Sequence, residues 1–537
     1  MKMLSKIYKY PILSLIVASV LLFYFNLAEL PVSIMEARNF NVAREMLTEG
    51  NWLLTTMNGI PRYEKPPFPA WFTTLFSQFN LSSVWLYRLP TSLMATLGVL
   101  FSYALFKTLG HHKKLAVTGA LILATSYYYI VIRFEAPSDT YTHVAMIGGL
   151  LFLAKAMNNF NIVLNSLLAI ILFAISVLSK GPVSLYTILL PFLIAYFISF
   201  KPNKKTILIC ISTVVFGTLI GALWYIYVRM ADPLVFNKIA TEETSNWSSY
   251  HVRPFYYYWS FVVQAGIWTI PAAISLVYPY FKTRVENKKL YKLSWVWTII
   301  AVILLSIIPE KKSRYLVPVL FPLALNIAQI IYYHFKIKKL DLVSKCALKL
   351  HYIILFIIGL SVVAIPIFIN QRTVEFWFWY YSYVGINFGI SAFIFFNYNP
   401  LNVKQLFITN LLIIFAITSL GTYGIKFMKA NENYKTLASA KIEKPIYYYK
   451  SIEPEIIWES NTISTLFDYT KKYRAKRIHV IVEKSYAQEF ENQIASKYTV
   501  TSKEVFDRNY FNGERNKKYR ERYILILYKL KLKANAK

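Results

Sequence analysis

Apolar residues gather along the chain in blocks of about 20, the length that a helix needs to cross roughly 30 Å of hydrocarbon. Short segments rich in lysine separate many of these blocks. The pattern predicts an all-α polytopic membrane domain. The thirteen predicted spans lie near residues 10–28, 84–106, 115–132, 138–156, 162–179, 183–200, 206–229, 255–280, 293–308, 315–333, 351–369, 376–396 and 405–425.

The basic loops predict the direction of these spans, because cytoplasmic loops carry an excess of Lys and Arg. With a cytoplasmic N-terminus, the inside loops contain the basic segments 111–114, 201–205, 282–292 and 336–349. Glu286 and Asp341 are the only acidic residues in these four segments. An odd number of spans then places the C-terminal residues on the outer, periplasmic face.

The polar segments predicted to lie outside have features of their own. The loop at about 29–83 is too long for a simple turn, and residues 36–50 within it have the spacing of an interfacial helix. A second outside loop covers about 230–254. Residues 429–537 are polar and contain strand-like runs between helix-like stretches. The chain is therefore predicted to divide into a transmembrane domain, 1–428, and a small C-terminal α/β soluble domain, 429–537.

Composition agrees with a membrane protein, since 56% of the residues are hydrophobic and only 16% are charged. The formal net charge of +32 comes largely from loop lysines, which indicates contact with membrane lipids. No basic element with interleaved aromatic residues predicts nucleic-acid binding. The two cysteines, Cys210 and Cys346, support neither a disulfide framework nor a cysteine metal site.

The N-terminus has lysines ahead of an apolar run, as a signal peptide does. The run is too long for the apolar core of a signal peptide, and Leu27-Ala28-Glu29 is a poor cleavage site. An uncleaved first span is therefore expected.

Most of the unusual polar residues of the membrane region fall on the predicted outer face. Ionisable residues at a bilayer are costly and are usually paired, exposed to water or functional. Because they come from distant parts of the chain, they predict one polar cavity that opens outward. They are Glu36, Glu64, Lys65, Arg133, Asp139, Lys180, His251, Arg253, Glu310, Lys311, Lys312 and Arg314.

Each of these residues also has a structural interpretation. Lys180 could snorkel at a helix end, the cations at 311–314 could anchor to lipid headgroups, and His251 could be an interface residue. Glu36 could pair with Arg38 or Arg44 on its own helix. Asp139 could pair with Arg133, six residues before it.

A cavity with several cations and few carboxylates suits a phosphate-bearing substrate, which Lys and Arg side chains bind. A carboxylate beside the reacting centre would act as general base on an acceptor hydroxyl. Glu64 and His251 could hold a divalent metal ion as a cofactor.

The first outside loop contains a series of short motifs in a fixed order: Met35-Glu36-Ala37-Arg38, Ala43-Arg44-Glu45-Met46, Gly50-Asn51-Trp52, Asn58-Gly59 and Tyr63-Glu64-Lys65-Pro66-Pro67. Further motifs follow in order: Arg133 with Asp139, Leu178-Ser179-Lys180-Gly181-Pro182, Trp224-Tyr225, His251 with Arg253-Pro254-Phe255-Tyr256-Tyr257-Tyr258, and Lys312 with Arg314-Tyr315 and Pro318. In these motifs the chain resembles bacterial lipid-linked-sugar transferases, which include the aminoarabinose transferases of lipid A and are distantly similar to the protein O-mannosyltransferases. The resemblance covers roughly residues 10–335.

The resemblance implies a membrane glycosyltransferase of the GT-C architecture that uses a polyprenyl-phosphate sugar donor on the outer face. It implies that Glu64 and His251 surround a metal ion. Lys65 would bind the donor phosphate, with help from Arg253 and Lys312.

The resemblance also places Asp139 among the carboxylates near the cavity. The family usually has an Asp directly before the acidic residue of its first-loop motif, and here that position is Met35. The role of the base then passes to Glu36 or to another carboxylate, so the candidate bases are Glu36 and Asp139. The candidate phosphate ligands are Lys65, Lys180, Arg253, Lys312 and Arg314.

The function predicted from the sequence is transfer of a sugar from a polyprenyl-phosphate donor to a lipid A, glycan or protein acceptor. The alternative is a transporter or flippase of a lipid-linked sugar. Transporters tend to have repeated halves and ionisable groups near the bilayer midplane. This sequence has no evident repeat, and its charges gather at one face, which favours the enzyme.

Overall fold

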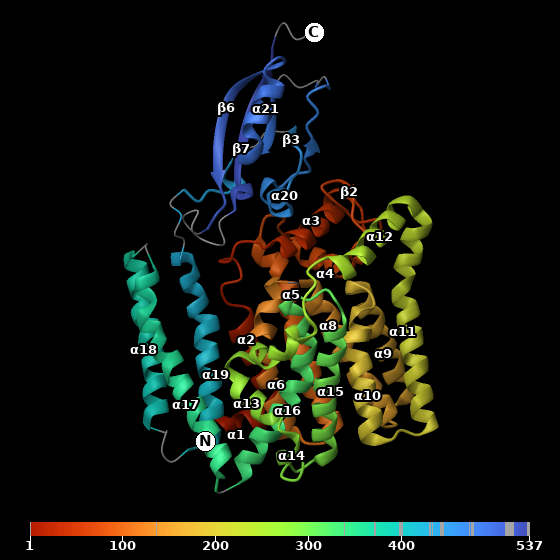
Figure 1. Cartoon of the computed structure of the whole chain (residues 1–537), viewed down its shortest axis with the longest axis vertical. Helices are drawn as coiled ribbons and strands as arrows, with labels where there is room; N and C mark the ends of the chain where they lie inside the picture. The colour runs from red at the N-terminus through yellow and green to blue at the C-terminus, as the bar shows by residue number, and fades with distance from the viewer. Residues whose placement is uncertain are drawn as a thin grey trace.

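The computed structural model describes residues 2–135, 137–337, 339–369, 372–396, 401–428, 431, 433–440, 445–471, 473, 477–510 and 520–533. A helical body carries a small sheet at one end, and the N-terminus lies near the opposite end (Figure 1). The predicted domain boundary at 428/429 falls beside residues outside the described ranges.

The helical body is built from helices of very different lengths. They are α1 (Lys2–Lys9), α2 (Pro11–Phe23), α5 (Val84–Gly110), α6 (Lys113–Ala124), α7 (Tyr127–Glu135), α8 (Pro137–Met157), α9 (Ile162–Lys180), η1 (Leu185–Leu189), α10 (Leu190–Phe200), α11 (Lys204–Ala231), η2 (Phe255–Trp268), α13 (Thr269–Ser275), α14 (Tyr278–Phe281), α15 (Lys288–Ile307), η3 (Ser313–Leu316), α16 (Val317–Lys336), α17 (Leu342–Ser361), η4 (Val362–Phe368), α18 (Val374–Phe396), α19 (Val403–Ser419) and η5 (Gly421–Met428).

Within the described residues, 7 helices are long and apolar enough to cross a membrane, or up to 9 if each bent pair counts as one span. The all-α membrane fold is confirmed, and the count of thirteen spans stays a prediction. Several predicted spans are broken rather than continuous. The span at 115–132 is bent by 50° between α6 and α7, and the one at 255–280 is divided among η2, α13 and α14.

The breaks have local causes. Thr125 and Ser126 lie between α6 and α7, and their hydroxyls donate to the carbonyls of Leu121 and Ile122 in the preceding turn. Gly266 inside η2 has φ +63°, which a helix cannot contain. Hydropathy alone does not report such features, because the residues around them remain apolar.

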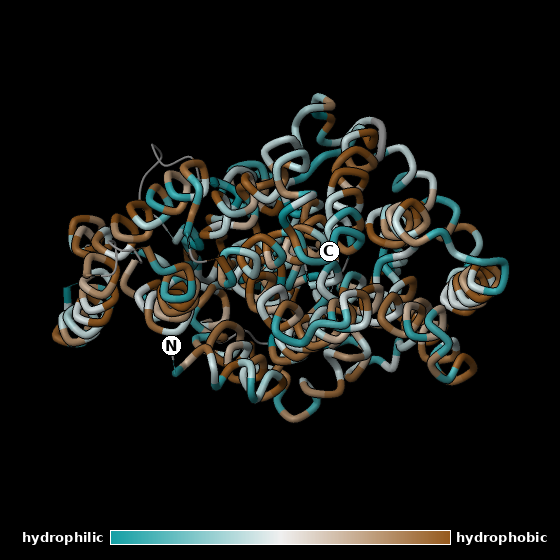
Figure 2. Tube along the Cα trace, turned by 90° about the horizontal axis from the view of Figure 1, so that it is seen from below, coloured by the Kyte–Doolittle hydropathy of each residue, from teal (hydrophilic) through white to brown (hydrophobic). Residues whose placement is uncertain are grey.

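The helices expose apolar side chains outward, as a lipid environment requires. On α11, Leu208, Phe216 and Leu223 are each more than half exposed. Figure 2 shows hydrophobic positions on the outer helices as well as in the interior. A surface of this kind would aggregate in water, and it is stable in hydrocarbon.

The segments joined to the sheet end of the body include the two predicted outside loops. The loop at 29–83 contains α3 (Ile34–Thr48), β1 (Thr56–Met57), β2 (Ile60–Pro61) and α4 (Phe68–Ser77), and the loop at 230–254 contains α12 (Pro233–Ser249). The helix predicted at 36–50 exists as α3, but it is not an interfacial helix. Its residues from Glu36 to Met46 are buried except Arg38, because α4 packs on one side and the tail helix α20 (Pro454–Ser460) on another.

The predicted C-terminal α/β region is confirmed as a five-stranded mixed sheet of order β4-β3-β5-β7-β6. Its elements are η6 (Leu437–Ser439), β3 (Ile446–Tyr448), α20 (Pro454–Ser460), β4 (Thr465–Leu466), β5 (Arg477–Glu483), η7 (Lys484–Tyr486), α21 (Ala487–Ile494), β6 (Tyr498–Asp507), η8 (Glu521–Tyr523) and β7 (Ile524–Leu532). The sequence did not indicate β6, because it is an edge strand whose residues 499–505 are all exposed.

The tail contacts the first loop through buried polar groups. The Arg44 guanidinium donates to the carbonyl oxygens of Ile457 and Trp458 at 2.8 and 3.0 Å, and Asn41 donates to that of Pro454 at 2.8 Å. Arg44 therefore serves the junction between α3 and α20 and does not pair with Glu36 on its own helix.

Candidate active site

Four side chains from three segments of the chain form what we call the Asp139 cluster: Asp139, His143, Lys180 and Arg314. Asp139 is only 2% exposed and forms an ion pair with Lys180 Nζ through Oδ1. Arg314 Nε lies 3.9 Å from the other carboxylate oxygen, Oδ2. His143 is one turn further along α8 and is close enough for the charges of Asp139 and Lys180 to act on it. A carboxylate thus lies between two cations inside the protein.

The packing of α8 against α9 explains why Asp139 meets Lys180. Asp139 is in the first turn of α8 and Lys180 is the last residue of α9. Thr142 and Ser176 join the two helices, since each hydroxyl donates to the backbone carbonyl of the other residue at 2.8 Å. The start of one helix therefore lies beside the end of the other.

Gly181 then allows the chain to turn immediately after Lys180. It has φ +75°, and a Cβ at this position would lie 2.7 Å from the Tyr225 hydroxyl oxygen. A side chain here would be strained and would press on Tyr225. The sequence Lys180-Gly181-Pro182 thus fixes the end of α9 and the position of the ammonium group.

The Asp139 cluster contains buried polar atoms with unused hydrogen-bonding capacity. Asp139 Oδ2, Arg314 Nε and His143 Nδ1 are buried and have no hydrogen-bond partner within the described part of the chain. Buried polar groups are normally hydrogen-bonded, so each exception requires an explanation. Unused acceptors and donors at one place are what a site has before a polar ligand binds.

Lys65 lies near the cluster and is more exposed than its members. Its charge acts on Lys180, as does that of Arg314. Lys65 Nζ is 3.3 Å from Glu243 Oε2, with side-chain exposures of 30% and 42%. Solvent screens this pair, so the ammonium can exchange Glu243 for a phosphate at small cost.

Tyr315 joins Lys312 to the same region. The Lys180 ammonium is 5.1 Å from the Tyr315 ring centre, and the Tyr315 hydroxyl donates to Glu310 Oε1 at 3.2 Å. Lys312 forms an ion pair with that same carboxylate. The charges of Glu310 and Lys312 therefore lie beside the Asp139 cluster.

Backbone hydrogen bonds hold His251 and Arg253 beside the segment that contains Glu310 and Lys312. The Lys311 backbone N–H donates to the His251 carbonyl at 3.1 Å, and the Arg253 N–H donates to the Pro309 carbonyl at 3.2 Å. Both residues are exposed. Lys311 itself is buried and donates through Nζ to two backbone carbonyls, so it has a structural role.

Glu36 lies in a separate, fully paired cluster. Arg88 contacts both of its carboxylate oxygens, at 2.7 and 3.0 Å, and the Ser33 N–H donates to Oε2 at 3.0 Å. The suggested pairing of Glu36 with Arg38 or Arg44 is therefore wrong. As a base Glu36 would first have to lose these bonds. Asp139 Oδ2 accepts no hydrogen bond among the described residues, so the geometry favours Asp139.

Arg133 has no contact with Asp139 among the interactions of the described residues. Its guanidinium donates to the Phe23 carbonyl and to Ser92 Oγ, and it lies 4.0 Å from the centre of the Phe134 ring. The suggested pairing of Asp139 with Arg133 is therefore wrong. The partner of Asp139 is Lys180, which is 41 residues away in the chain.

Glu64 and His251 were predicted to hold a metal ion. Glu64 Oε2 lies 3.7 Å from Arg62 Nε, and among the described residues no interaction joins Glu64 to His251. In the part of the chain that the structure describes, no three His, Cys, Asp or Glu side chains are grouped as metal ligands. Two separate donors are too few to define a metal site.

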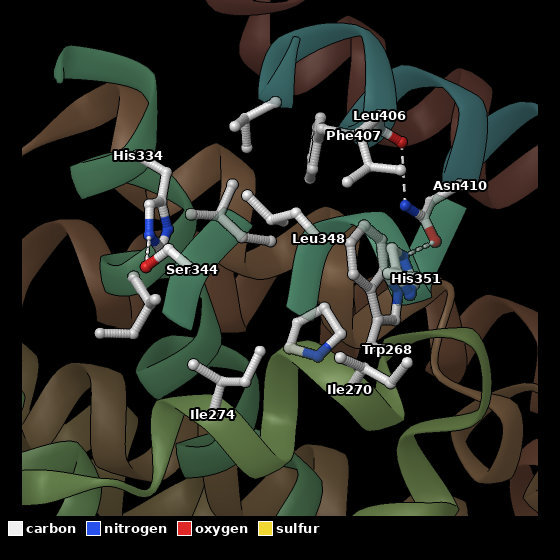
Figure 3. Close-up of a pocket in the computed structure, with 14 residues that line it drawn as sticks. Trp268, Ile270, Ile274, His334, Ser344, Leu348, His351, Leu406, Phe407 and Asn410 are labelled. Atoms are coloured by element: carbon white, nitrogen blue, oxygen red, sulfur yellow. Dashed lines mark hydrogen bonds between the residues drawn. The ribbon is translucent and has the colours of Figure 1, made fainter. Parts of the chain in front are cut away.

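An apolar cavity of about 30 Å³ lies elsewhere, between α13, α16, α17 and α19 (Figure 3). Its polar groups are already paired, His334 with Ser344 at 2.9 Å and His351 with Asn410 at 3.1 Å. The cavity is far too small for a sugar or a lipid. We therefore regard it as part of the packing of α17 and α19 against the body.

Comparison with known proteins gives matches in sequence and in fold. Residues 64–226 match the dolichyl-phosphate-mannose-protein mannosyltransferase family. An undecaprenyl phosphate-alpha-4-amino-4-deoxy-L-arabinose arabinosyl transferase of Enterobacter sp. (strain 638) is 24% identical over 55% of this chain and 54% of its own length. The protein of that name from Wigglesworthia glossinidia brevipalpis is 25% identical over 73% of this chain and 70% of its own. The chain spans about half the length of the first curated relatives that it matches.

Two solved structures share the whole fold at 15% identity. ArnT from Cupriavidus metallidurans in the apo state has a TM-score of 0.67, with 98% of both chains covered. The same protein bound to undecaprenyl phosphate has a TM-score of 0.68, with 98% of this chain and 97% of that one covered. With its apolar helices, the chain has the character of a multi-pass membrane protein. The chain is therefore similar in sequence to these mannosyl- and arabinosyltransferases over part of its length, and similar in fold to the two ArnT structures over nearly all of it.

Proposed function

We propose that this protein is a glycosyltransferase that moves a sugar from a polyprenyl-phosphate donor to an acceptor through the Asp139 cluster. The observation that carries the proposal is a buried carboxylate between two cations, with one oxygen that accepts no hydrogen bond among the described residues. The relatives are named for undecaprenyl-phosphate-linked aminoarabinose, which makes that donor the first to test. Lipid A, another glycan and a protein remain the candidate acceptors.

The reaction that fits this arrangement is a direct displacement at the anomeric carbon of the donor. The acceptor oxygen forms the new bond to that carbon while the bond to the phosphate oxygen breaks, and the electron pair leaves with the phosphate. Asp139 Oδ2 takes the proton of the acceptor hydroxyl. Lys180, Arg314 and the more exposed Lys65 neutralise the departing phosphate. A phosphate is a good leaving group, so no second carboxylate is needed as acid, in contrast to glycosidases.

The proposal is tested by supplying the purified protein with undecaprenyl-phosphate aminoarabinose and lipid A and detecting the product by mass spectrometry. Formation of modified lipid A that requires the intact protein supports sugar transfer. Mass spectrometry of lipid A and exported glycoproteins from a deletion strain then identifies the acceptor. If the protein moved the donor lipid across vesicle membranes and formed no product with any acceptor class, the flippase alternative would replace the proposal.

Replacing Lys65 with alanine should raise KM for the donor by about 10- to 100-fold, because one phosphate counter-charge is lost in a partly screened position. Lys65→Arg should be partly active, since a planar fork replaces a point charge. Initial rates over a range of donor concentrations measure both. Lys238→Ala removes another exposed lysine, on α12, and serves as the control. An unchanged KM in Lys65→Ala would remove this residue from the donor site.

We also propose that the N-terminus is cytoplasmic and that the C-terminal sheet is periplasmic. Two of the lysine-rich loops, after α5 and after α14, meet at one cavity at the end of the body away from the sheet. Reporter fusions after residues 112, 203, 287 and 342 should therefore be cytoplasmic, and fusions after 240 and 480 external. An external reporter at 203 would contradict the orientation.

A divalent ion at Glu64 and His251 stays a prediction, and the mechanism does not depend on it. Metal analysis of the purified wild type, Glu64→Gln and His251→Ala measures it directly. Loss of a stoichiometric ion in both variants would establish the pair as ligands, since each removes one of few donors. Equal metal content in all three proteins would show that Glu64 and His251 do not bind a metal ion.

A further inference from the structure

A second polar cavity lies at the end of the helical body opposite the C-terminal sheet. Its volume is about 660 Å³, and it opens between the α5–α6 turn, the α14–α15 connection and the end of α16. In Figure 1 this is the end that carries α14. The cavity is within the size range of small-molecule sites and is remote from the Asp139 cluster.

The cavity has a surplus of positive charge. Four cations line it, Arg284, Lys288, Lys289 and Lys336, against the single carboxylate of Glu286. Lys336 Nζ donates to Glu286 Oε2 at 2.6 Å, so these two charges cancel. Among the residues that the structure describes, neither Lys288 nor Lys289 forms an ion pair. Cations gathered around a concave surface attract an anion more strongly than dispersed ones do.

Two helices begin at this cavity, and their N-termini add to the positive potential. Asn287 caps α15 by accepting from the Leu290 N–H at 2.9 Å, and His112 caps α6 by accepting from the Leu115 N–H at 3.2 Å. All four of these residues line the cavity. Each cap satisfies one backbone N–H of its first turn. The remaining backbone N–H groups of these two first turns are suited to bind an anion such as phosphate.

Gln329 gives an independent indication of a ligand. Its side chain is 3% exposed and lines the cavity, and its Oε1 has no hydrogen-bond partner among the described residues. Its Nε2 already donates to Ser294 Oγ at 3.0 Å. A free carbonyl oxygen beside a cationic surface is complementary to a molecule that has a hydroxyl near its phosphate.

We propose that this cavity binds a phosphate-bearing polar headgroup, with Lys288, Lys289 and the start of α15 contacting the phosphate and Gln329 accepting from a neighbouring hydroxyl. Glycerol phosphate has this chemistry, either free or as the headgroup of phosphatidylglycerol. The site does not depend on the proposed sugar transfer, because it is at the other end of the protein and is measured by binding alone.

The test is native mass spectrometry of the full chain in neutral detergent, titrated with phosphatidylglycerol, phosphatidylcholine or free glycerol phosphate. Wild type should retain phosphatidylglycerol in preference to phosphatidylcholine. Lys288→Gln/Lys289→Gln should weaken that binding about tenfold or more. The matched control is Lys204→Gln/Lys205→Gln, which removes a pair of lysines that also follows a capping asparagine, Asn203, at the start of a long helix.

Selective loss in the Lys288/Lys289 variant supports the site. Displacement of the lipid by millimolar glycerol phosphate would show that the free ester is a sufficient ligand, and failure of displacement would assign the site to the lipid. Equal weakening in both variants would mean general attraction of the lysine-rich surface and would overturn the proposal. Unchanged binding in the Lys288/Lys289 variant would overturn it as well.

Discussion

Replacing Asp139 with asparagine is expected to lower turnover by about 10²-fold or more while the protein remains folded and inserted. Asparagine has nearly the same shape, so the packing of α8 against α9 is kept. It cannot take a proton from the acceptor at the position of Oδ2, the Asp139 oxygen that accepts no hydrogen bond among the described residues and has Arg314 Nε 3.9 Å away. Turnover, donor-lipid binding and thermal stability should be measured on one preparation.

Two comparisons separate a base from a positioning residue. If Asp139 only held Lys180 in place, Asp139→Asn would weaken donor binding along with turnover, and Lys180→Gln would reproduce the whole effect. If Asp139 is the base, kcat falls while donor binding is retained. Normal turnover in Asp139→Asn together with an inactive but stable Glu36→Gln protein would assign the base to Glu36 instead.

The membrane fold was predictable because hydrocarbon imposes a strong and simple pattern. Apolar blocks of about 20 residues identify spans regardless of how the helices pack. Where the helices break is set by particular atoms, such as the Thr125 and Ser126 hydroxyls and the positive φ of Gly266. The strand β6 was missed for a related reason, since an exposed edge strand lacks the alternation that marks a strand.

The candidate site was predictable in part of its membership and not in its pairing. The sequence singled out Asp139, Lys180 and Arg314 because charges next to apolar spans are costly. It could not show that the start of α8 meets the end of α9. His143 was missed, although it follows Asp139 by four residues and so shares a face of the helix with it. Glu243 was missed because α12 was taken for a loop.

The pairing of Glu36 shows the same limit. The sequence offered Arg38 and Arg44, which are neighbours on α3, whereas the actual partner, Arg88, is 52 residues away. Arg44 is instead used by the tail, more than 400 residues further along the chain. Pairs between distant segments depend on the completed fold, which a single sequence does not reveal.

Replacing Glu36 with glutamine is expected to destabilise the protein by about 3–5 kcal/mol, because it leaves the Arg88 charge buried without its counter-ion. Both side chains are at most 2% exposed, so water cannot compensate. Arg88 also donates to the carbonyls of Leu27, Leu30 and Pro31, which fix the chain between α2 and α3. Thermal or SDS-induced unfolding of the purified protein in detergent measures the loss.

The partner variant makes the structural role of this pair testable. Glu36→Leu/Arg88→Met removes both charges, and it should be more stable than either single variant because no unpaired charge remains buried. Arg62→Gln serves as the control, since its partner Glu64 is 37% exposed and can be solvated when the pair is broken. If Glu36→Gln unfolded like the wild type but lost turnover, Glu36 would belong to the chemistry and the assignment of Asp139 would have to be reversed. If the double variant were no more stable than Glu36→Gln, the carbonyl contacts of Arg88, rather than its charge pairing with Glu36, would hold this junction together.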